Sequence, residues 1–158
     1  MQIGKLRLYL ETTVFNYYFD EDRPGHQDVV KLFEAIGAGQ FDGYASTFVM
    51  AELRQASEPK RSNMLNLADK YGIIVLRPTP DVVRLSGLYI KKHIIPSSYR
   101  YDSAHIAMAA VNKLDIVVSY NFKHINRDKT KALTSAINLS ENFGSVAIYT
   151  AKEVLSNE

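Results

Sequence analysis

Short apolar segments alternate with helical segments along this chain, and this alternation constrains the fold more than any other feature. Five segments have the apolar or β-branched character of buried strands. They are Leu6–Leu10, Gly43–Ser46, Ile73–Leu76, Ile116–Ser119 and Val146–Thr150. Because helical segments separate them, we expect a mainly parallel sheet with helices on both faces. The sequence thus predicts an α/β fold, with one domain over residues 1–158.

Local start and stop signals delimit the helices between these strands. Thr79 followed by Pro80 is typical of a helix start, and Gly37 and Gly72 are typical of helix ends. The helices are predicted at Thr13–Phe19, His26–Ala38, Thr47–Ala56, Pro59–Tyr71, Pro80–Lys92, Tyr101–Leu114, Lys129–Ile137 and Ala151–Leu155, with helical turns near Phe122–Ile125 and a loop at Ile94–Arg100.

Composition excludes several classes of protein. The chain has 158 residues, of which 46% are hydrophobic, and this suits one ordinary globular domain. It has no cysteine, which excludes disulfides and thiolate zinc sites and suits a reducing cytoplasm. No apolar run approaches the ~18 residues of a membrane span, and Met1–Lys5 is too short and polar for a secretory signal. We therefore expect a cytoplasmic protein that is not bound to membranes.

Charge is distributed unevenly although the net charge is only +2. Residues 1–58 carry five Lys or Arg and nine Asp or Glu, a net of −4, whereas residues 84–131 carry nine and three, a net of +6. Such a distribution suits an acidic metal site flanked by basic contacts to phosphate. An uneven but ordinary solvated surface is the alternative.

Three acids and one amide recur where strands end and helices begin. Glu11 follows the first strand, Asn121 follows the fourth, and Glu52 and Asp102 lie near the starts of two helices. In an open parallel sheet these places share one edge, where ligands bind. Clusters of oxygen ligands hold Mg²⁺ or Mn²⁺, so the pattern points to metal-dependent chemistry on an anionic substrate.

Each of these residues also has a less specific interpretation. Glu11 and Asp102 stand where an acid favours a helix N-terminus without binding anything. Glu52 interrupts an apolar helical stretch, and a buried acid needs a partner, which a metal ion would supply. We expect His105, one turn after Asp102, to be a hydrogen-bonded packing residue rather than a ligand. Thr12 would donate a hydrogen bond to a carboxylate or hold the turn.

Four motifs in order give the chain a family resemblance. Leu8-Tyr9-Leu10-Glu11-Thr12-Thr13 resembles the opening motif of PIN-domain ribonucleases, a hydrophobic strand followed by an acid and hydroxyl residues. Ala51-Glu52-Leu53 is similar to the motif of the second acid, and Asp102-Ser103-Ala104-His105-Ile106-Ala107 to that of the third. Val117-Val118-Ser119-Tyr120-Asn121 is similar to the strand that ends in Thr/Ser-x-Asp.

The resemblance implies a three-layer α/β/α fold with a sheet of about five strands and Mg²⁺- or Mn²⁺-dependent cleavage of RNA. It also implies a VapC-like toxin that a small antitoxin protein silences and that forms a homodimer. Glu11, Glu52 and Asp102 would be the metal ligands and catalytic residues, with Asn121 as the fourth. Asn121 and Ser119 would orient a water or bind a second ion.

Two departures from the family pattern bear on activity. Position 11 is Glu rather than Asp, and position 121 is Asn where the family usually has Asp. The amide keeps an oxygen acceptor but removes a charge, which weakens the case for a second metal ion. A catalytically weak or inactive module that binds RNA or protein is therefore the first alternative, and a phosphatase-like α/β protein is the second.

Basic and aromatic residues supply candidate contacts to partners. Arg100, Lys123 and Arg127, or Lys92, would contact RNA phosphates, although solvated side chains are the default for such residues. The cluster Tyr17-Tyr18-Phe19 would stack bases, pack in the core or dock a partner protein.

Overall fold

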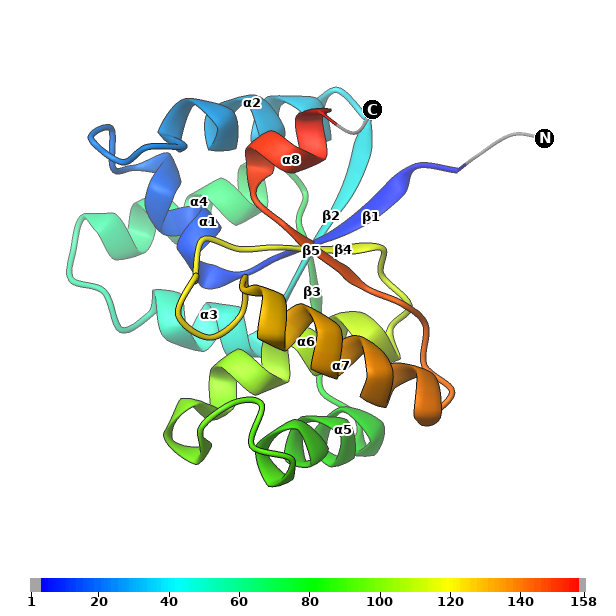
Figure 1. The fold of residues 1–158 in the computed structure, drawn as a ribbon. Coiled ribbons are helices and arrows are strands. Elements are labelled where there is room, and N and C mark those ends of the chain that lie inside the picture. The colour runs from blue at the N-terminus through cyan, green and yellow to red at the C-terminus, as the bar shows by residue number, and fades with distance from the viewer. Residues whose placement is uncertain (1–3, 157–158) are drawn as a thin grey trace.

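Five parallel strands form the centre of the protein (Figure 1). The structure is a computed structural model that describes residues 4–156. Its strands are β1 (Leu6–Leu10), β2 (Phe41–Ser46), β3 (Ile74–Leu76), β4 (Ile116–Val118) and β5 (Ala147–Tyr149). Their order in the sheet is β3-β2-β1-β4-β5. The chain therefore winds outward from β1 to β3, returns to the other side of β1, and winds outward again, so the order reverses between β1 and β4.

Helices cover both faces of this sheet and complete three layers (Figure 1). They are α1 (Thr12–Tyr18), α2 (His26–Gly37), α3 (Thr47–Leu53), α4 (Lys60–Lys70), α5 (Pro80–Lys91), α6 (Arg100–Val111), α7 (Asp128–Ser140) and α8 (Ala151–Ser156), with a 3₁₀ turn, η1 (Ser97–Tyr99), before α6. Helices α2 and α8 pack together on one face, and α5 packs against α6 and α7 on the other. The predicted α/β/α fold with a five-stranded parallel sheet is confirmed.

The core explains why the site can be held rigidly. The side chains of Leu8, Tyr9 and Leu10 in β1 are fully buried, as expected for the central strand of a parallel sheet. In α6 the residues from Asp102 to Ala110 are all buried, and four of them are alanines, which allow a helix to approach the sheet closely. The two elements that carry Glu11 and Asp102 are thus anchored in the core.

Some boundaries differ from the predicted ones. Strand β2 begins two residues earlier, at Phe41, and α3 ends three residues earlier, at Leu53. The helical turns predicted near Phe122–Ile125 are present as hydrogen-bonded turns, in which the backbone N–H groups of Ile125 and Asn126 both donate to the carbonyl of Asn121. The predicted domain of residues 1–158 extends at both ends beyond the described residues, and remains a prediction.

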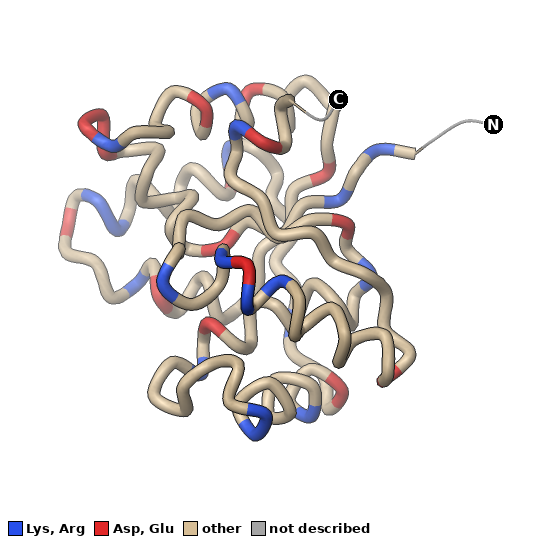
Figure 2. Tube along the Cα trace, viewed as in Figure 1, with Lys and Arg blue, Asp and Glu red and all other residues tan. Residues whose placement is uncertain are grey.

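Acidic and basic residues gather on different segments of the fold. Figure 2 shows basic residues along the loop between β4 and α7 and acidic residues at the turn between α1 and α2.

Within the described residues, none of the helices combines the length and the apolar character needed to span a bilayer.

Candidate metal and nucleic-acid site

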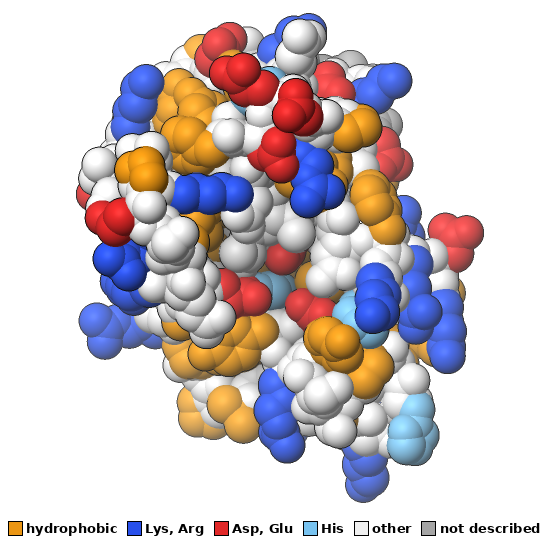
Figure 3. All heavy atoms as spheres, turned by 90° about the vertical axis from the view of Figure 1, so that its left-hand side faces the viewer, with side chains coloured by type: hydrophobic (Ala, Val, Ile, Leu, Met, Phe, Trp, Pro, Cys, Tyr) orange, Lys and Arg blue, Asp and Glu red, His pale blue; other side chains and the backbone are white. Residues whose placement is uncertain are grey.

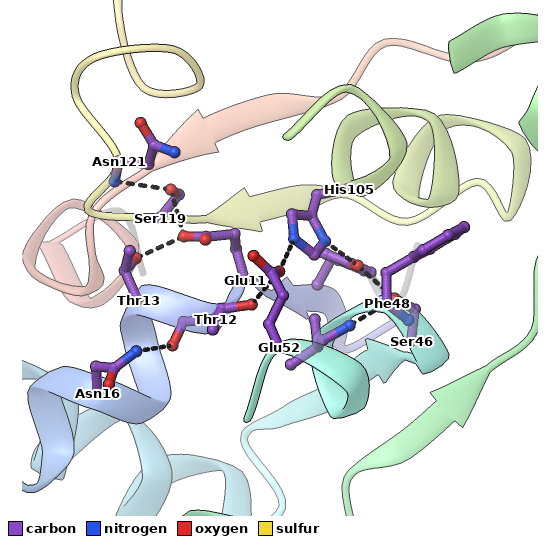
Figure 4. Close-up of polar contacts among 12 residues, drawn as sticks. Glu11, Thr12, Thr13, Asn16, Ser46, Phe48, Glu52, His105, Ser119 and Asn121 are labelled. Atoms are coloured by element: carbon purple, nitrogen blue, oxygen red, sulfur yellow. Dashed lines mark hydrogen bonds and ion pairs between the residues drawn. The ribbon is translucent and has the colours of Figure 1, made fainter. Parts of the chain in front are cut away.

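A hollow lies at the carboxyl edge of the sheet, beside the point where the strand order reverses. Figure 3 shows acidic side chains gathered beside histidine in this hollow, with hydrophobic and basic side chains around it. A cavity of about 370 Å³ opens here. It is lined by Glu52, Ser98, Tyr99, Arg100, Tyr101 and Asp102. Figure 4 shows how Glu11, Glu52, His105 and Ser119 approach one another from four separate elements of the fold.

Glu11 lies directly after β1 and is only 3% exposed. It occupies the N-cap position of α1, but its side chain makes no capping hydrogen bond. Instead its Oε1 accepts hydrogen bonds from Thr13 Oγ1 at 2.5 Å and from Ser119 Oγ at 2.7 Å (Figure 4). Burial raises the pKa of Glu11, and the opposing effects of His105 and the two hydroxyls do not cancel the increase.

Glu52 projects from α3 and has partners within the protein. Its Oε1 accepts hydrogen bonds from His105 Nε2 and from Thr12 Oγ1, both at 2.6 Å. Burial by itself would raise the pKa of Glu52, but the hydrogen bond and charge of His105, together with Thr12, bring it below its ordinary value. The acid was predicted to need a partner, which a metal ion would supply; within the protein, His105 already partners it, as an ion pair when His105 is protonated.

His105 is fully buried and both of its ring nitrogens are hydrogen-bonded. Nε2 contacts Glu52, and Nδ1 lies 2.7 Å from the hydroxyl of Tyr9, which lies 2.7 Å from Ser46 Oγ. Burial opposes protonation, but the hydrogen bond to Glu52 and the charges of Glu11, Glu52 and Asp102 raise the pKa of His105. The prediction of a packed, hydrogen-bonded histidine is confirmed, but the sequence did not reveal its contact with Glu52.

This chain of contacts returns to the helix that carries Glu52. Ser46 is the N-cap of α3, and its Oγ accepts hydrogen bonds from the backbone N–H groups of Phe48 and Val49. Burial raises the pKa of Tyr9 well above its ordinary value, so the hydroxyl stays neutral and can donate. One polar network therefore fixes both the backbone and the carboxylate of Glu52 (Figure 4).

Asp102 is the third residue of α6, and Tyr99 rather than Asp102 is the N-cap of that helix. Burial raises the pKa of Asp102, although His105, a hydrogen bond from the Asn121 side chain and His124 act in the opposite direction. The other end of the Asn121 amide, Oδ1, accepts a hydrogen bond from the backbone N–H of His124 at 3.0 Å. Asn121 thus caps the turn after β4 and also supports Asp102, while its role as a ligand remains a prediction.

Several carboxylates lie close enough to influence one another. The charge of Glu52 raises the pKa of both Glu11 and Asp102. Nevertheless, in residues 4–156 no group of three or more His, Cys, Asp or Glu side chains is arranged so that it could hold a metal ion. Oε2 of Glu11 and of Glu52 accepts no hydrogen bond in that part of the chain, so each glutamate has an oxygen left for another partner.

The predicted phosphate contacts divide into two groups. Arg100 lines the cavity together with Glu52 and Asp102. Lys123 lies farther along the rim, with its Nζ 5.7 Å from the centre of the Tyr99 ring. Arg127, the N-cap residue of α7, donates from Nε to Thr130 Oγ1 in the first turn of that helix.

Comparison with known proteins identifies the fold. The PIN domain family model matches residues 8–130. The chain belongs to the PIN domain family. No curated protein sequence matched it. Among solved structures, a chain of VapBC2 from Rickettsia felis, crystallised with a promoter DNA fragment, has a TM-score of 0.58 at 12% identity, over 90% of this chain and 97% of that one.

Two further structures share this PIN fold. VapC20 from Mycobacterium tuberculosis, described as a toxin that cleaves the sarcin-ricin loop, has a TM-score of 0.55 at 12% identity, over 74% of this chain and 92% of that one. DNA-bound VapBC from Salmonella typhimurium has a TM-score of 0.54 at 13% identity, over 92% of this chain and 98% of that one. At these identities the likeness establishes the fold, and activity has to be argued from the site.

The sequence did not reveal every residue that shapes the site. Ser46 was predicted as a possible cap of the next helix, and it is the N-cap of α3, but nothing in its local pattern or in that of Tyr9 shows that Tyr9 joins Ser46 to His105. Thr13 was predicted to donate to a carboxylate or to hold the turn, and it does donate to Glu11. Its Oγ1 also accepts a hydrogen bond from the backbone N–H of Tyr120 and so ties α1 to the loop after β4. These contacts join residues 37 to 108 positions apart, so only the fold brings them together.

Proposed function

We propose that this PIN-domain protein is a divalent-metal-dependent endoribonuclease and the toxin of a toxin–antitoxin pair. The observation that carries the proposal is the convergence of Glu11, Glu52 and Asp102, from three separate elements, at the carboxyl edge of the sheet beside its switch point. In this proposal the three carboxylates are the catalytic residues, and Asn121 is the fourth candidate.

The donor set fits Mg²⁺ or Mn²⁺. Glu11, Glu52 and Asp102 supply only carboxylate oxygens, which both ions prefer, and the two glutamates each keep one oxygen free of hydrogen bonds within the described residues. When bound, such an ion would lower the pKa of a water and neutralise charge on the phosphate. Burial, with a smaller contribution from the charge of Glu52, raises the pKa of Glu11 and Asp102, and a bound cation would oppose both effects.

The protein's own residues would orient this chemistry. Thr13 and Ser119 hold Oε1 of Glu11, and Thr12 and His105 hold Oε1 of Glu52, so neither carboxylate has to be ordered when substrate binds. Arg100, inside the cavity, would bind a phosphate of the substrate, with Lys123 and Arg127 as outer contacts.

RNA is the substrate class that the comparisons support. VapC20, which shares the fold, is described as cleaving the sarcin-ricin loop, and a basic rim around an acidic centre suits a polyanion that must reach metal ions. The same neighbours support a protein partner, since two of them are VapBC complexes. We therefore propose a small antitoxin as a partner, together with a homodimer and a cytoplasmic location.

The aromatic residues of α1 supply a docking place for that antitoxin. Tyr18 and Phe19 line a cavity of about 260 Å³ with α4 residues that include Leu67 and Lys70. Tyr17 does not line it, because its ring stacks on Tyr120 with 4.2 Å between ring centres. Of the three aromatic residues predicted from the sequence, only Tyr18 and Phe19 therefore line the groove.

Metal binding and RNA cleavage by the purified chain test the proposal together. We expect Mn²⁺ or Mg²⁺ to raise the unfolding temperature of the wild type, through linkage, and to support cleavage of RNA. Glu52→Ala and Asp102→Ala should remove both effects, whereas Glu21→Ala, which changes an exposed acid, should remove neither. Cleavage at the wild-type rate by Glu52→Ala would refute the assignment of the site.

One observation favours the alternative of a weak or inactive binding module. Asn121 already uses its oxygen to accept the N–H of His124, and its amide nitrogen faces Asp102 rather than adding a charge to the site. Binding of RNA or of a partner protein, without cleavage at any concentration of Mn²⁺, would support this alternative over the ribonuclease.

A further inference from the structure

An exposed tyrosine stands at the rim of the cavity that holds Glu52 and Asp102. Tyr99 lines this cavity and is 42% exposed, although its ring is large and apolar. It lies between the phosphate-binding candidate Arg100 and the loop after β4. Tyrosine is enriched at binding interfaces because its ring is apolar and its hydroxyl is polar.

The Tyr99 ring rests on a rigid support. It packs on His124, with 4.1 Å between the ring centres and 38° between the ring planes. His124 is 7% exposed and is fixed at both backbone groups, since its N–H donates to Asn121 Oδ1 and its carbonyl accepts a hydrogen bond from Thr130 Oγ1. The N–H of Tyr99 donates to the carbonyl of Pro96. The ring is therefore held in place before any ligand binds.

Two further features point to an anionic, planar ligand. Lys123 places its Nζ over the Tyr99 ring, 5.7 Å from the ring centre, and Arg100 lines the same cavity, so cations accompany the aromatic ring. In the described residues, His124 Nε2 is the one buried side-chain nitrogen or oxygen that has no hydrogen-bond partner.

We propose that Tyr99 is a stacking platform for an unpaired base of single-stranded RNA, next to the phosphate that binds in the cavity. Aromatic rings combined with neighbouring cations are how proteins bind single strands, because every base has a face that can stack. Bases in a duplex are already stacked on one another and cannot use such a platform. This inference rests on the proposed function, and it names the form of RNA that the site takes.

The chain contains no tryptophan, so one substitution supplies a specific reporter. In Tyr99→Trp the new indole keeps a large aromatic face at the rim, and a base that stacks on it should quench its fluorescence. The matched control is Phe122→Trp, because Phe122 is 56% exposed and lies in the adjacent loop but does not line the cavity. Both variants are titrated with a single-stranded RNA and with a duplex of the same sequence, in EDTA so that no cleavage occurs.

We expect single-stranded RNA to quench the indole of Tyr99→Trp but not that of Phe122→Trp, and the duplex to quench neither. Tyr99→Leu should weaken binding of the single strand about 5- to 150-fold, the range for loss of one stacked base. Tyr99→Phe should bind like the wild type, because stacking uses the ring and not the hydroxyl. Thermal unfolding of each variant shows whether the fold is retained. If Tyr99→Leu does not fold, Tyr99→Trp and Tyr99→Phe still test the stacking, because both keep an aromatic ring at position 99.

Different results overturn different statements. If wild type and Tyr99→Leu bind single-stranded RNA equally, or if the duplex quenches the indole as well as the single strand, the stacking platform is refuted while the ribonuclease proposal stands. If the wild type neither binds nor cleaves any RNA, the proposed function itself fails. An indole that responds to a purified antitoxin but not to RNA overturns the inference and assigns this rim to the protein partner.

Discussion

The polar network behind Glu52 predicts that Tyr9→Phe affects the site although Tyr9 is fully buried. The substitution removes only the hydroxyl that bridges Ser46 Oγ and His105 Nδ1, each at 2.7 Å, and it leaves the ring that packs in the core. Ser46 keeps its capping contacts in α3, so its loss is small. His105 Nδ1, by contrast, is left buried without a partner.

The size of the effect follows from these contacts. Leaving a buried polar group unpaired costs about 1–3 kcal/mol, and a lost neutral hydrogen bond costs about 1 kcal/mol. The free energy of unfolding should therefore fall by about 2–4 kcal/mol, which for a chain of this length lowers the unfolding temperature by roughly 5–15 °C. Because His105 also orients Glu52, the affinity for Mn²⁺ should fall by up to about tenfold, the lower end of the range for groups that orient a ligand.

The matched control is Tyr89→Phe. Tyr89 is equally buried and its hydroxyl donates to Asn138, but this contact joins α5 to α7, away from the carboxylates. Urea unfolding measures stability in both variants, and calorimetry measures Mn²⁺ binding. We expect both variants to lose stability and only Tyr9→Phe to lose affinity. Equal metal affinities in the two variants would refute the idea that the network positions Glu52.

Two more predictions concern charge in the site. Asn121→Asp replaces the donor to Asp102 with a second carboxylate, so it should lower the stability of the metal-free protein by about 1.5–3 kcal/mol. It should also lower the Mn²⁺ concentration needed to restore that stability. Thermal unfolding during a metal titration measures both effects, and curves identical to those of the wild type would remove Asn121 from the site. Since the pKa of His105 is raised in the folded state, that state binds more protons than the unfolded chain, and the urea midpoint of the metal-free protein should fall as pH rises above about 6.5. In His105→Gln the urea midpoint should no longer fall as pH rises above about 6.5. If it still falls, another group is responsible for the pH dependence.

The fold was largely predictable because strand and helix signals are local. Apolar runs such as Leu6–Leu10 lie within one element, and the Thr79-Pro80 pair marks a helix start whatever its surroundings; the Thr79 side chain indeed accepts a hydrogen bond from the N–H of Val82. Boundaries failed at the ends of elements. Strand β2 begins at Phe41 and α3 ends at Leu53, and the local pattern marked neither position.

The site was predictable only in part, for a physical reason. Acids at strand exits can be recognised in sequence, since topology alone brings such positions to one edge. Their partners cannot be recognised this way, because a tyrosine in β1 and a histidine in α6 meet only after β1 and α6 have packed together. The sequence also could not decide between capping and ligation for Asn121, since an amide oxygen serves both.

The contacts suggest why His105 and Asn121 occur together in a site that departs from the family pattern. Each carboxylate already has a donor before any cation binds: Glu11 has two hydroxyls, Glu52 has His105 and Thr12, and Asp102 has the Asn121 amide. A fourth carboxylate at position 121 would take the donor from Asp102 and add a negative charge beside it, and an apolar residue at position 105 would leave Glu52 without its ion pair. Both residues reduce the repulsion among buried acids, so the folded protein tolerates the cluster without metal. The same compensation reduces the number of charges that attract a cation, and for this reason we expect one ion to bind firmly and a second only weakly.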